Sequence, residues 1–237
     1  MKNLFLKLIL GSALSVFTLI GCASDSLMIK YGTDSESRGL LCRPSGQGPY
    51  PAVVYNHGKA VDVQGYEASE AGGYKLMEIC EALAADGFMT FVPIRQSGGN
   101  DPGPYMEEIN RAIDFVKLLP DVDASRLALM GFSRGGMLTL MTGVRRDDLS
   151  ALIILAPAPG RGYFERAVRE VYKINVPVLL MVEASDGQWV LDDFQLLSSA
   201  LDTYEKKSTA IKYDRGGGHR LFWEVGYYWD DLRSFLK

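Results

Sequence analysis

Histidine, cysteine and tryptophan are scarce in this sequence, which has two, three and three of them in 237 residues. No cluster of His, Cys, Asp or Glu has the spacing of a metal site, and no G-x-G-x-x-G motif marks a dinucleotide site. We therefore expect neither a metal nor a cofactor. The net charge of −4 is not extreme and gives no reason to expect a nucleic-acid partner.

The sequence also lacks an apolar run long enough for a comfortable transmembrane helix, which needs roughly 20 residues. The run over residues 8–20 is shorter than that. Lys2 and Lys7 precede it and small residues follow it, which is the pattern of a secretory signal peptide. We therefore predict that residues 1–21 are a signal peptide and take no part in the fold.

The four residues LIGC at positions 19–22 resemble the lipobox of bacterial lipoproteins. This resemblance implies cleavage before Cys22 and acylation of that cysteine, and two or three acyl chains anchor a protein stably. The residue after it is Ala23, not the Asp that retains lipoproteins in the inner membrane, which favours the outer membrane. We expect an exported domain, periplasmic or at the cell surface, tethered by residues 22–37. An ordinary signal peptide that ends near a cysteine is the alternative.

Cys42 and Cys80 are the cysteines that remain unacylated after such processing. An exported protein meets an oxidising compartment, which permits a disulfide. Cys42 ends a strand-like segment and Cys80 lies in a helical pattern, and nothing in the sequence places them within bonding distance. We therefore predict two free thiols that act as small apolar side chains.

Strand-like and helical segments alternate from residue 51 onward. The strand-like segments are continuous apolar runs, which is typical of strands buried on both faces of a parallel sheet. They read PAVVYN, FMTFVP, RLALMGF, ALIILA and VPVLLMVEA. The sequence therefore predicts one α/β domain over residues 38–237, with a doubly covered, mostly parallel sheet of about seven to eight strands. The first one or two strands are expected to form an antiparallel edge.

Polar residues follow four of the predicted strands directly. Because ligands bind beyond the carboxyl ends of parallel strands, these four stretches are expected to meet at one edge of the sheet. They are His57-Gly58-Lys59, Ser133-Arg134-Gly135-Gly136, Ser185-Asp186-Gly187 and the segment RGGGHR, which contains His219.

The segment GFSRGG over residues 131–136 joins a strand to a helix through Ser133. Such a sharp turn forces strained backbone angles on the serine, and side chains two positions away on either side would collide. Gly131 and Gly135 occupy those two positions. The pattern predicts that Ser133 is a nucleophile exposed above the sheet.

A serine hydroxyl is a poor nucleophile unless a base takes its proton, and the base needs an acid that orients it. His219 follows the last strand and is predicted to be the base. Asp186, after the preceding strand, is predicted to be the acid. Asp192 and Asp193 compete for that role, but they lie farther along a predicted helix, where solvated aspartates are ordinary.

Residues 38–237 resemble the α/β-hydrolase superfamily, most closely its dienelactone-hydrolase-like branch and the neighbouring acylaminoacyl-peptidase-like branch. The stretches that carry the resemblance are YPAVVYNHG, VDASRLALMGFSRGG, PVLLMVEASDGQWV and GGGHRLF. The resemblance implies an α/β-hydrolase fold. The segment over residues 157–175, where relatives insert a lid, is short, so no large lid domain is expected. Dienelactone hydrolases use a cysteine nucleophile, and Ser133 in its place favours a serine esterase.

The same resemblance implies the roles of the site residues. Ser133 is the implied nucleophile, Asp186 the acid and His219 the base, in the chain order of this superfamily. The backbone N–H groups of Arg134 and Lys59 are the implied oxyanion hole. The Arg134 side chain either binds a substrate carboxylate or is solvated.

Further residues beside these turns are assigned to substrate binding. They are His57, Gly58, Tyr66, Tyr105 and Trp189, with Tyr163 and Phe164 as additional candidates. For His57 the alternative is a structural role that holds the oxyanion turn, and for the aromatic residues it is packing.

These features predict a lipid-anchored serine hydrolase that cleaves carboxylic esters through an acyl-enzyme. Its expected partners are an acyl-ester substrate and the membrane that holds its lipid. Peptidase and thioesterase activities use the same triad and stay open, as does a non-catalytic, surface-tethered binding module. All three triad positions hold competent residues, which favours an enzyme.

Overall fold

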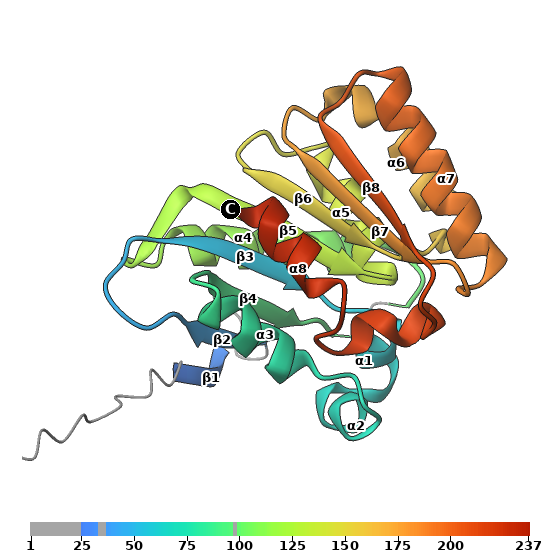
Figure 1. The fold of residues 1–237 in the computed structure, drawn as a ribbon. Helices are drawn as coiled ribbons and strands as arrows, with labels where there is room; N and C mark the ends of the chain where they lie inside the picture. The colour runs from blue at the N-terminus through green and yellow to red at the C-terminus, as the bar shows by residue number, and fades with distance from the viewer. Residues whose placement is uncertain (1–24, 33–36, 97–98) are drawn as a thin grey trace, which may run out of the picture.

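The computed structural model describes residues 25–32, 37–96 and 99–237. One sheet runs through the molecule in the strand order β1-β2-β4-β3-β5-β6-β7-β8 (Figure 1). Its strands are β1 (Asp25–Lys30), β2 (Arg38–Arg43), β3 (Tyr50–Asn56), β4 (Met89–Ile94), β5 (Val122–Phe132), β6 (Ala151–Leu155), β7 (Val178–Glu183) and β8 (Ser208–Tyr213). The β1–β2 and β2–β4 pairs are antiparallel and the other pairs are parallel. The expected mostly parallel sheet with an antiparallel edge is confirmed.

Helices cover both faces of the sheet, which explains the continuous apolar runs of the central strands. In Figure 1, α3 and α8 lie in front of the sheet and α4 and α5 lie behind it. Every residue of β4 and of β7 is buried, as expected for strands between two helical layers. The helices are α1 (Lys59–Gln64), α2 (Tyr66–Ala71), α3 (Leu76–Ala85), α4 (Gly103–Lys117), α5 (Arg134–Gly143), α6 (Tyr163–Val168), α7 (Gln188–Thr203) and α8 (Trp229–Leu236).

The sheet begins earlier than the predicted domain boundary at residue 38. Strand β1 pairs with β2 over its whole length, from Asp25 opposite Arg43 to Lys30 opposite Arg38. Ile29 packs against the core, so this segment is part of the domain and not only a tether. The predicted signal peptide and the predicted acylation of Cys22 fall within residues 1–24, outside the described residues.

Cys42 and Cys80 form a disulfide, so the prediction of two free thiols is wrong. Their Cα atoms are 5.8 Å apart and the sulfur atoms are bonded at 2.05 Å. Strand β2 lies next to β4, and α3, which leads into β4, packs across both strands. The two cysteines therefore face each other between β2 and α3, a proximity that depends on where the edge strand joins the sheet.

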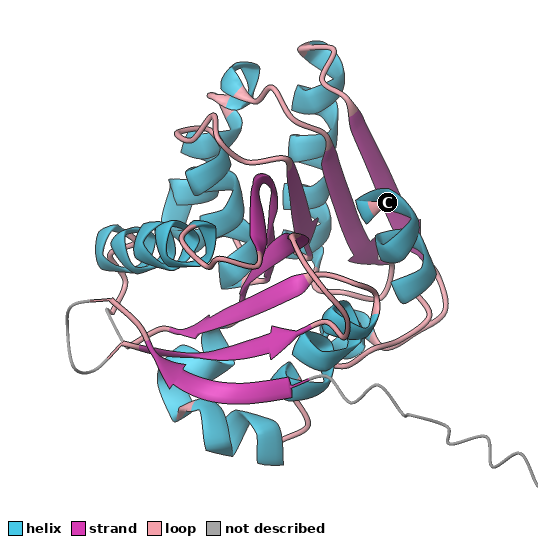
Figure 2. Cartoon of the chain, turned by 90° about the vertical axis from the view of Figure 1, so that its left-hand side faces the viewer, coloured by secondary structure: helices cyan, strands magenta, loops and turns pink. Residues whose placement is uncertain are grey.

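The connection between β6 and β7 is short, as the sequence predicts. It contains only α6 and two 3-10 turns, η1 (Gly160–Gly162) and η2 (Val171–Lys173). This segment is too small for a lid domain. Figure 2 shows the strands of the sheet with helices on either side of them. Among the described residues, no helix has both the length and the apolar character needed to cross a membrane.

Candidate active site

Ser133 lies on the predicted sharp turn between β5 and α5. Its backbone has φ 55° and ψ −116°, a left-handed conformation that a residue with a side chain rarely adopts. The glycines on either side are required by close contacts. A Cβ atom at Gly131 would lie 2.3 Å from the carbonyl oxygen of Gly135, and one at Gly135 would lie 1.9 Å from that of Asn56. The strained turn and the need for both glycines are as predicted.

The structure brings Ser133, His219 and Asp186 together in a hydrogen-bonded chain. His219 Nε2 is 2.9 Å from Ser133 Oγ, and His219 Nδ1 is 2.8 Å from Asp186 Oδ2. The carboxylate accepts the Nδ1–H proton, which leaves Nε2 free to accept from the serine hydroxyl. Asp186 Oδ1 also accepts the backbone N–H of Gly187 at 2.7 Å, so the carboxylate itself is held in place.

The competing aspartates do not contact His219. Asp192 is exposed and bonds to Gln188 on its own helix at 2.8 Å. Asp193 is 5% exposed, so the expectation that it is solvated is wrong. Its burial, together with the negative charges of Glu165 and Asp192, raises its pKa to about 7. This buried carboxyl lies between α6 and α7, and Asp186 is the aspartate that reaches the histidine.

Glu183 joins the loop of Asp186 to the loop before His219, a role that no sequence pattern indicated. This fully buried carboxylate at the end of β7 accepts the backbone N–H and the hydroxyl of Ser185, beside Asp186. It also accepts the N–H groups of Arg215 at 3.1 Å and Gly216 at 2.9 Å, in the loop that leads to His219. Burial opposes its ionisation, but these hydrogen bonds outweigh it and lower the pKa of Glu183 to about 2.

The two N–H groups expected to form the oxyanion hole both belong to the first residue of a helix. Lys59 begins α1 and Arg134 begins α5. The N–H groups in the first turn of a helix have no acceptor within the helix and point outward from its positive end. The N–H of the preceding Gly58 is used inside the protein, since it donates to Tyr74 Oη at 3.0 Å. Lys59 and Arg134 therefore remain the candidates.

His57 supports the oxyanion turn from within and has no exposed surface for a substrate. Its Nε2 accepts the backbone N–H of Arg95 at 3.1 Å, and its Nδ1 lies 3.0 Å from the carbonyl oxygen of Gly58. Burial, with the nearby positive charge of Arg95, lowers the pKa of His57 well below its usual value, so the ring is neutral. Of the two roles considered, the structural one fits. Gly58 itself lies close to Ser133, 3.5 Å from a Cβ position on Gly58 to the Cβ of the serine.

The Arg134 side chain does not extend into solvent. It is 14% exposed, and its Nη1 donates to Asp62 Oδ2 at 3.1 Å and to Tyr105 Oη at 3.0 Å. Tyr105 is buried and bonded to this arginine, and both residues line a small cavity of about 50 Å³. An internal ion pair therefore holds the Arg134 side chain, a role that was not among the alternatives considered.

Among the aromatic candidates, Trp189 is the one that lies at the site. It is 47% exposed, and its ring centroid is 5.6 Å from that of His219. Phe164 is fully buried in the core, while Tyr66 and Tyr163 are partly buried and pack against that core. Trp189 therefore offers an apolar surface beside the base to whatever enters the site.

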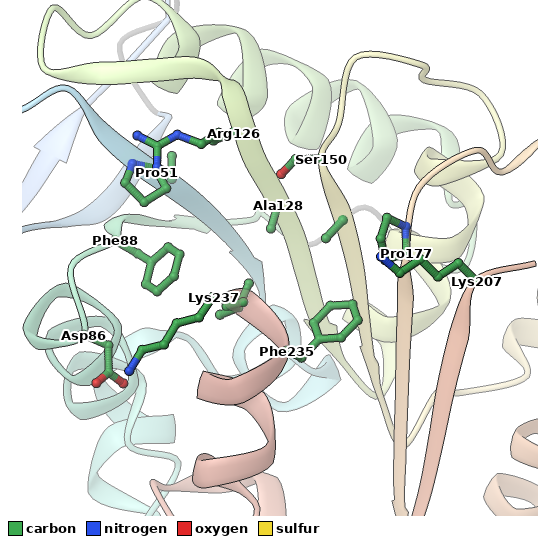
Figure 3. A pocket seen from close by; sticks show the side chains of 13 residues that line it. Pro51, Asp86, Phe88, Arg126, Ala128, Ser150, Pro177, Lys207, Phe235 and Lys237 are labelled. Atoms are coloured by element: carbon green, nitrogen blue, oxygen red, sulfur yellow. The ribbon is translucent and has the colours of Figure 1, made fainter.

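A large pocket lies at the opposite edge of the sheet and contains none of these residues. Its volume is about 560 Å³, and it opens between α8 and the amino ends of β3 and β6 (Figure 3). Pro51, Ala128, Phe235 and Lys237 are among the side chains around it. Ser133, Asp186 and His219 lie at the carboxyl edge, so this pocket is separate from the candidate active site. The described residues contain no group of three or more His, Cys, Asp or Glu side chains placed to hold a metal ion.

The strained serine turn, the serine–histidine–aspartate chain and the eight-stranded sheet define an α/β hydrolase. Within that class, residues 38–223 match the family model described as the dienelactone hydrolase family, and the chain belongs to this family. The solved dienelactone hydrolase from Anabaena variabilis has a similar fold, with a TM-score of 0.65 at 17% identity over 90% of this chain and 95% of that one. The acylaminoacyl peptidase of Pyrococcus horikoshii gives a TM-score of 0.68 at 15% identity, over 84% of this chain and 38% of that one.

Curated proteins with similar sequences include cutinases and a thioesterase. Cutinase 2 of Thermobifida cellulosilytica is 29% identical over 140 residues, which cover 56% of this chain and 50% of the cutinase. Acyl-coenzyme A thioesterase 6 of Homo sapiens is 27% identical over 118 residues, 50% of this chain and 26% of that protein. The chain thus spans half or less of the length of these two relatives.

Proposed function

We propose that this protein is a serine hydrolase that cleaves carboxylic esters through an acyl-enzyme. The observation that carries the proposal is the chain from Ser133 Oγ to His219 at 2.9 Å and from His219 to Asp186 at 2.8 Å. In this mechanism His219 Nε2 takes the hydroxyl proton as Ser133 Oγ attacks the ester carbonyl carbon. The resulting imidazolium is stabilised by the carboxylate of Asp186.

The backbone N–H groups of Lys59 and Arg134 stabilise the negative oxygen of the tetrahedral intermediate in this proposal. The intermediate collapses as the alkoxy group leaves with the proton from His219, and the acyl group stays on Ser133. A water molecule then gives its proton to the same histidine and attacks the acyl-enzyme. The carboxylic acid leaves, and the serine regains its proton.

Similarity to proteins named cutinases supports an ester as the substrate. A serine at the nucleophile position, where dienelactone hydrolases have cysteine, also favours a serine esterase over dienelactone hydrolysis. The short connection between β6 and β7 and the exposed Trp189 favour a substrate with a bulky apolar acyl or alcohol group. Amide and thioester substrates, suggested by the peptidase and thioesterase similarities, are alternative outcomes of the same assay.

We also propose that the protein is exported and carries a lipid on Cys22. The disulfide between Cys42 and Cys80 supports export, because disulfides persist mainly in oxidising compartments. Strand β1 begins at Asp25 beside Arg43, at the edge of the sheet opposite Ser133. A lipid three residues before β1 would therefore hold the active site away from the membrane. Metabolic labelling with a palmitate analogue should mark the wild type and not Cys22→Ser, and equal labelling of both contradicts the anchor.

A panel of p-nitrophenyl esters of increasing chain length, with aminoacyl anilides and acyl thioesters beside it, tests the proposed activity. We expect hydrolysis of the esters at the highest kcat/KM and its loss in Ser133→Ala. Faster hydrolysis of the anilides or thioesters would reassign the substrate class. Absence of all three activities, with the fold intact, favours the non-catalytic binding module.

A further inference from the structure

The two N–H groups of the proposed oxyanion hole come from two different helices. Lys59 begins α1 after β3, and Arg134 begins α5 after β5. Strands β3 and β5 are neighbours in the sheet, so the two helices start side by side. An oxyanion is stabilised well only when both donors are in place at once. Stabilisation of the oxyanion therefore depends on how the starts of α1 and α5 are placed relative to each other.

Asp62 connects these two helix starts through side chains. It lies in α1, three residues after Lys59, and its side chain is fully buried. Its Oδ2 accepts a hydrogen bond from Nη1 of Arg134 at 3.1 Å. The backbone N–H of Arg134 is the second donor of the proposed oxyanion hole. One charge-assisted hydrogen bond therefore joins α1, which carries the first donor, to Arg134 itself.

The same carboxylate is also fixed to the strand on the other side of β3. Arg95, which follows β4, places its Nη2 3.2 Å from Oδ1 of Asp62 and donates to the carbonyl oxygen of His57. Its backbone N–H donates to the His57 ring. The turn before Lys59 is thus held to β4, while Asp62 is held to both arginines. A buried carboxylate with this set of partners has a single well-defined position.

Tyr105 completes the arrangement by fixing the direction of the Arg134 side chain. Its hydroxyl accepts from Nη1 of Arg134 at 3.0 Å, and the guanidinium lies 5.3 Å from the centre of its ring. The arginine therefore cannot swing away from Asp62 without losing two contacts. Its polar contacts are directed inward to α1 and α4.

We infer that Asp62 is a positioning residue that holds the N–H groups of Lys59 and Arg134 at the separation an oxyanion requires. This inference rests on the proposed serine-hydrolase function. Asp62 acts through the two helix starts and does not touch the substrate. Because the oxyanion forms only after Ser133 attacks, loss of the link weakens the transition state and leaves ground-state binding unchanged.

The test compares Asp62→Asn, Arg134→Gln and the double variant with wild type, using p-nitrophenyl butyrate as the substrate. Asp123→Asn is the matched control, since it breaks an Asp–Arg pair on the exposed part of β5, where Arg126 Nε lies 2.7 Å from Asp123. We expect each single variant to lower kcat by about 10–100-fold, with KM within about threefold of wild type. The double variant should lose little more than the worse single one, because the two residues act as a unit. Asp123→Asn should behave as wild type.

A second readout separates positioning from general damage to the fold. A trifluoromethyl ketone forms a hemiketal with the serine and places a negative oxygen in the oxyanion hole, whereas the matching methyl ketone binds as a ground-state analogue. Inhibition by the trifluoromethyl ketone should weaken by about 10–100-fold in both single variants. Inhibition by the methyl ketone should not change.

Equal weakening of both ketones, or a kcat within threefold of wild type in both single variants, overturns the inference. If Asp62→Asn does not fold, Arg134→Gln decides the question, since it leaves Asp62 paired with Arg95. Activity that is lost in Ser133→Ala but kept in these variants overturns this inference alone. Activity that survives in Ser133→Ala overturns the proposed function and this inference with it.

Discussion

Glu183 Oε1 accepts the backbone N–H of Gly216 at 2.9 Å, across the gap between the loops that follow β7 and β8. The other oxygen of the same carboxylate accepts the N–H of Ser185 at 2.6 Å. Asp186 lies in the first of these loops and His219 directly follows the second, so Glu183 fixes the distance between Asp186 and His219. Glu183 therefore has a structural role, and its removal should change both the activity and the stability of the protein.

Glu183→Gln should therefore damage activity and acid-dependent stability together. Replacing the carboxylate removes the charge from hydrogen bonds that each contribute ~2 kcal/mol, and loosens the Asp186–His219 pair, so kcat should fall by about 10–100-fold. The carboxyl pKa is about 2 in the folded protein against 4.5 in its ordinary state. The stability it contributes is present above pH 4.5 and is lost as the pH falls toward 2. Denaturant unfolding at pH 7 and pH 3 should show a gap between wild type and variant that narrows at the lower pH, and a constant gap contradicts this account.

Removing the disulfide should lower thermal stability and leave activity intact. The bond between Cys42 and Cys80 closes a loop with a sequence separation of 38 residues, which corresponds to about 4 kcal/mol in the chain-entropy model. The double variant Cys42→Ala/Cys80→Ala should melt roughly 5–15 °C lower than wild type. Wild type in a strong reductant should shift in the same direction, and the double variant should not respond to it. Identical melting of wild type and double variant contradicts a bond in the folded protein.

The fold and the core of the site could be predicted because local patterns determine them. Apolar runs indicate buried parallel strands, and the carboxyl ends of such strands meet at one edge, so Ser133, Asp186 and His219 were brought together without knowledge of the strand order. The disulfide could not be predicted, because it depends on β2 joining the sheet beside β4, and no local sequence pattern specifies that pairing. In the sequence, Glu183 is only the last residue of a predicted strand. Its role in the site comes from accepting N–H groups about 30 residues away in the sequence, which the local pattern does not reveal.

Asp193 should make stability depend on pH in the direction opposite to Glu183. Its pKa is raised from 3.8 to about 7, mainly by burial. The stability associated with its protonated form is fully present below pH 3.8 and is lost as the pH rises through 7. Asp193→Asn keeps a neutral side chain at all pH values, so it should be more stable than wild type by about 2–4 kcal/mol at pH 8.

Unfolding of Asp193→Asn and wild type should coincide near pH 4. The variant Asp202→Asn, at an exposed position near the end of the same helix α7, is the matched control and should follow wild type from pH 4 to pH 8. A variant at Asp193 that is no more stable than wild type at pH 8 shows that the carboxylate is tolerated in its ionised form. Activity should be unaffected in both variants, because neither aspartate contacts His219.

Trp189→Ala should affect binding of the substrate more than the chemical step. The exposed indole lies beside His219 and offers an apolar surface to an acyl chain. KM for p-nitrophenyl octanoate should rise about tenfold, while kcat/KM for the acetate changes little. Tyr204→Ala is the control, since Tyr204 has the same exposed fraction of 47% but lies at the end of α7. Equal effects on acetate and octanoate contradict a role in acyl recognition.

Covalent labelling with a fluorophosphonate, followed by mass spectrometry of the digested protein, tests most directly whether Ser133 is an activated nucleophile. An activated serine attacks the phosphorus atom and loses fluoride, whereas ordinary serines do not react. We expect one adduct, on Ser133, with labelling abolished in Ser133→Ala and slowed on the order of 10⁴-fold or more in His219→Ala. An adduct on another residue, no adduct in the folded protein, or labelling that persists at the wild-type rate in His219→Ala would contradict the account.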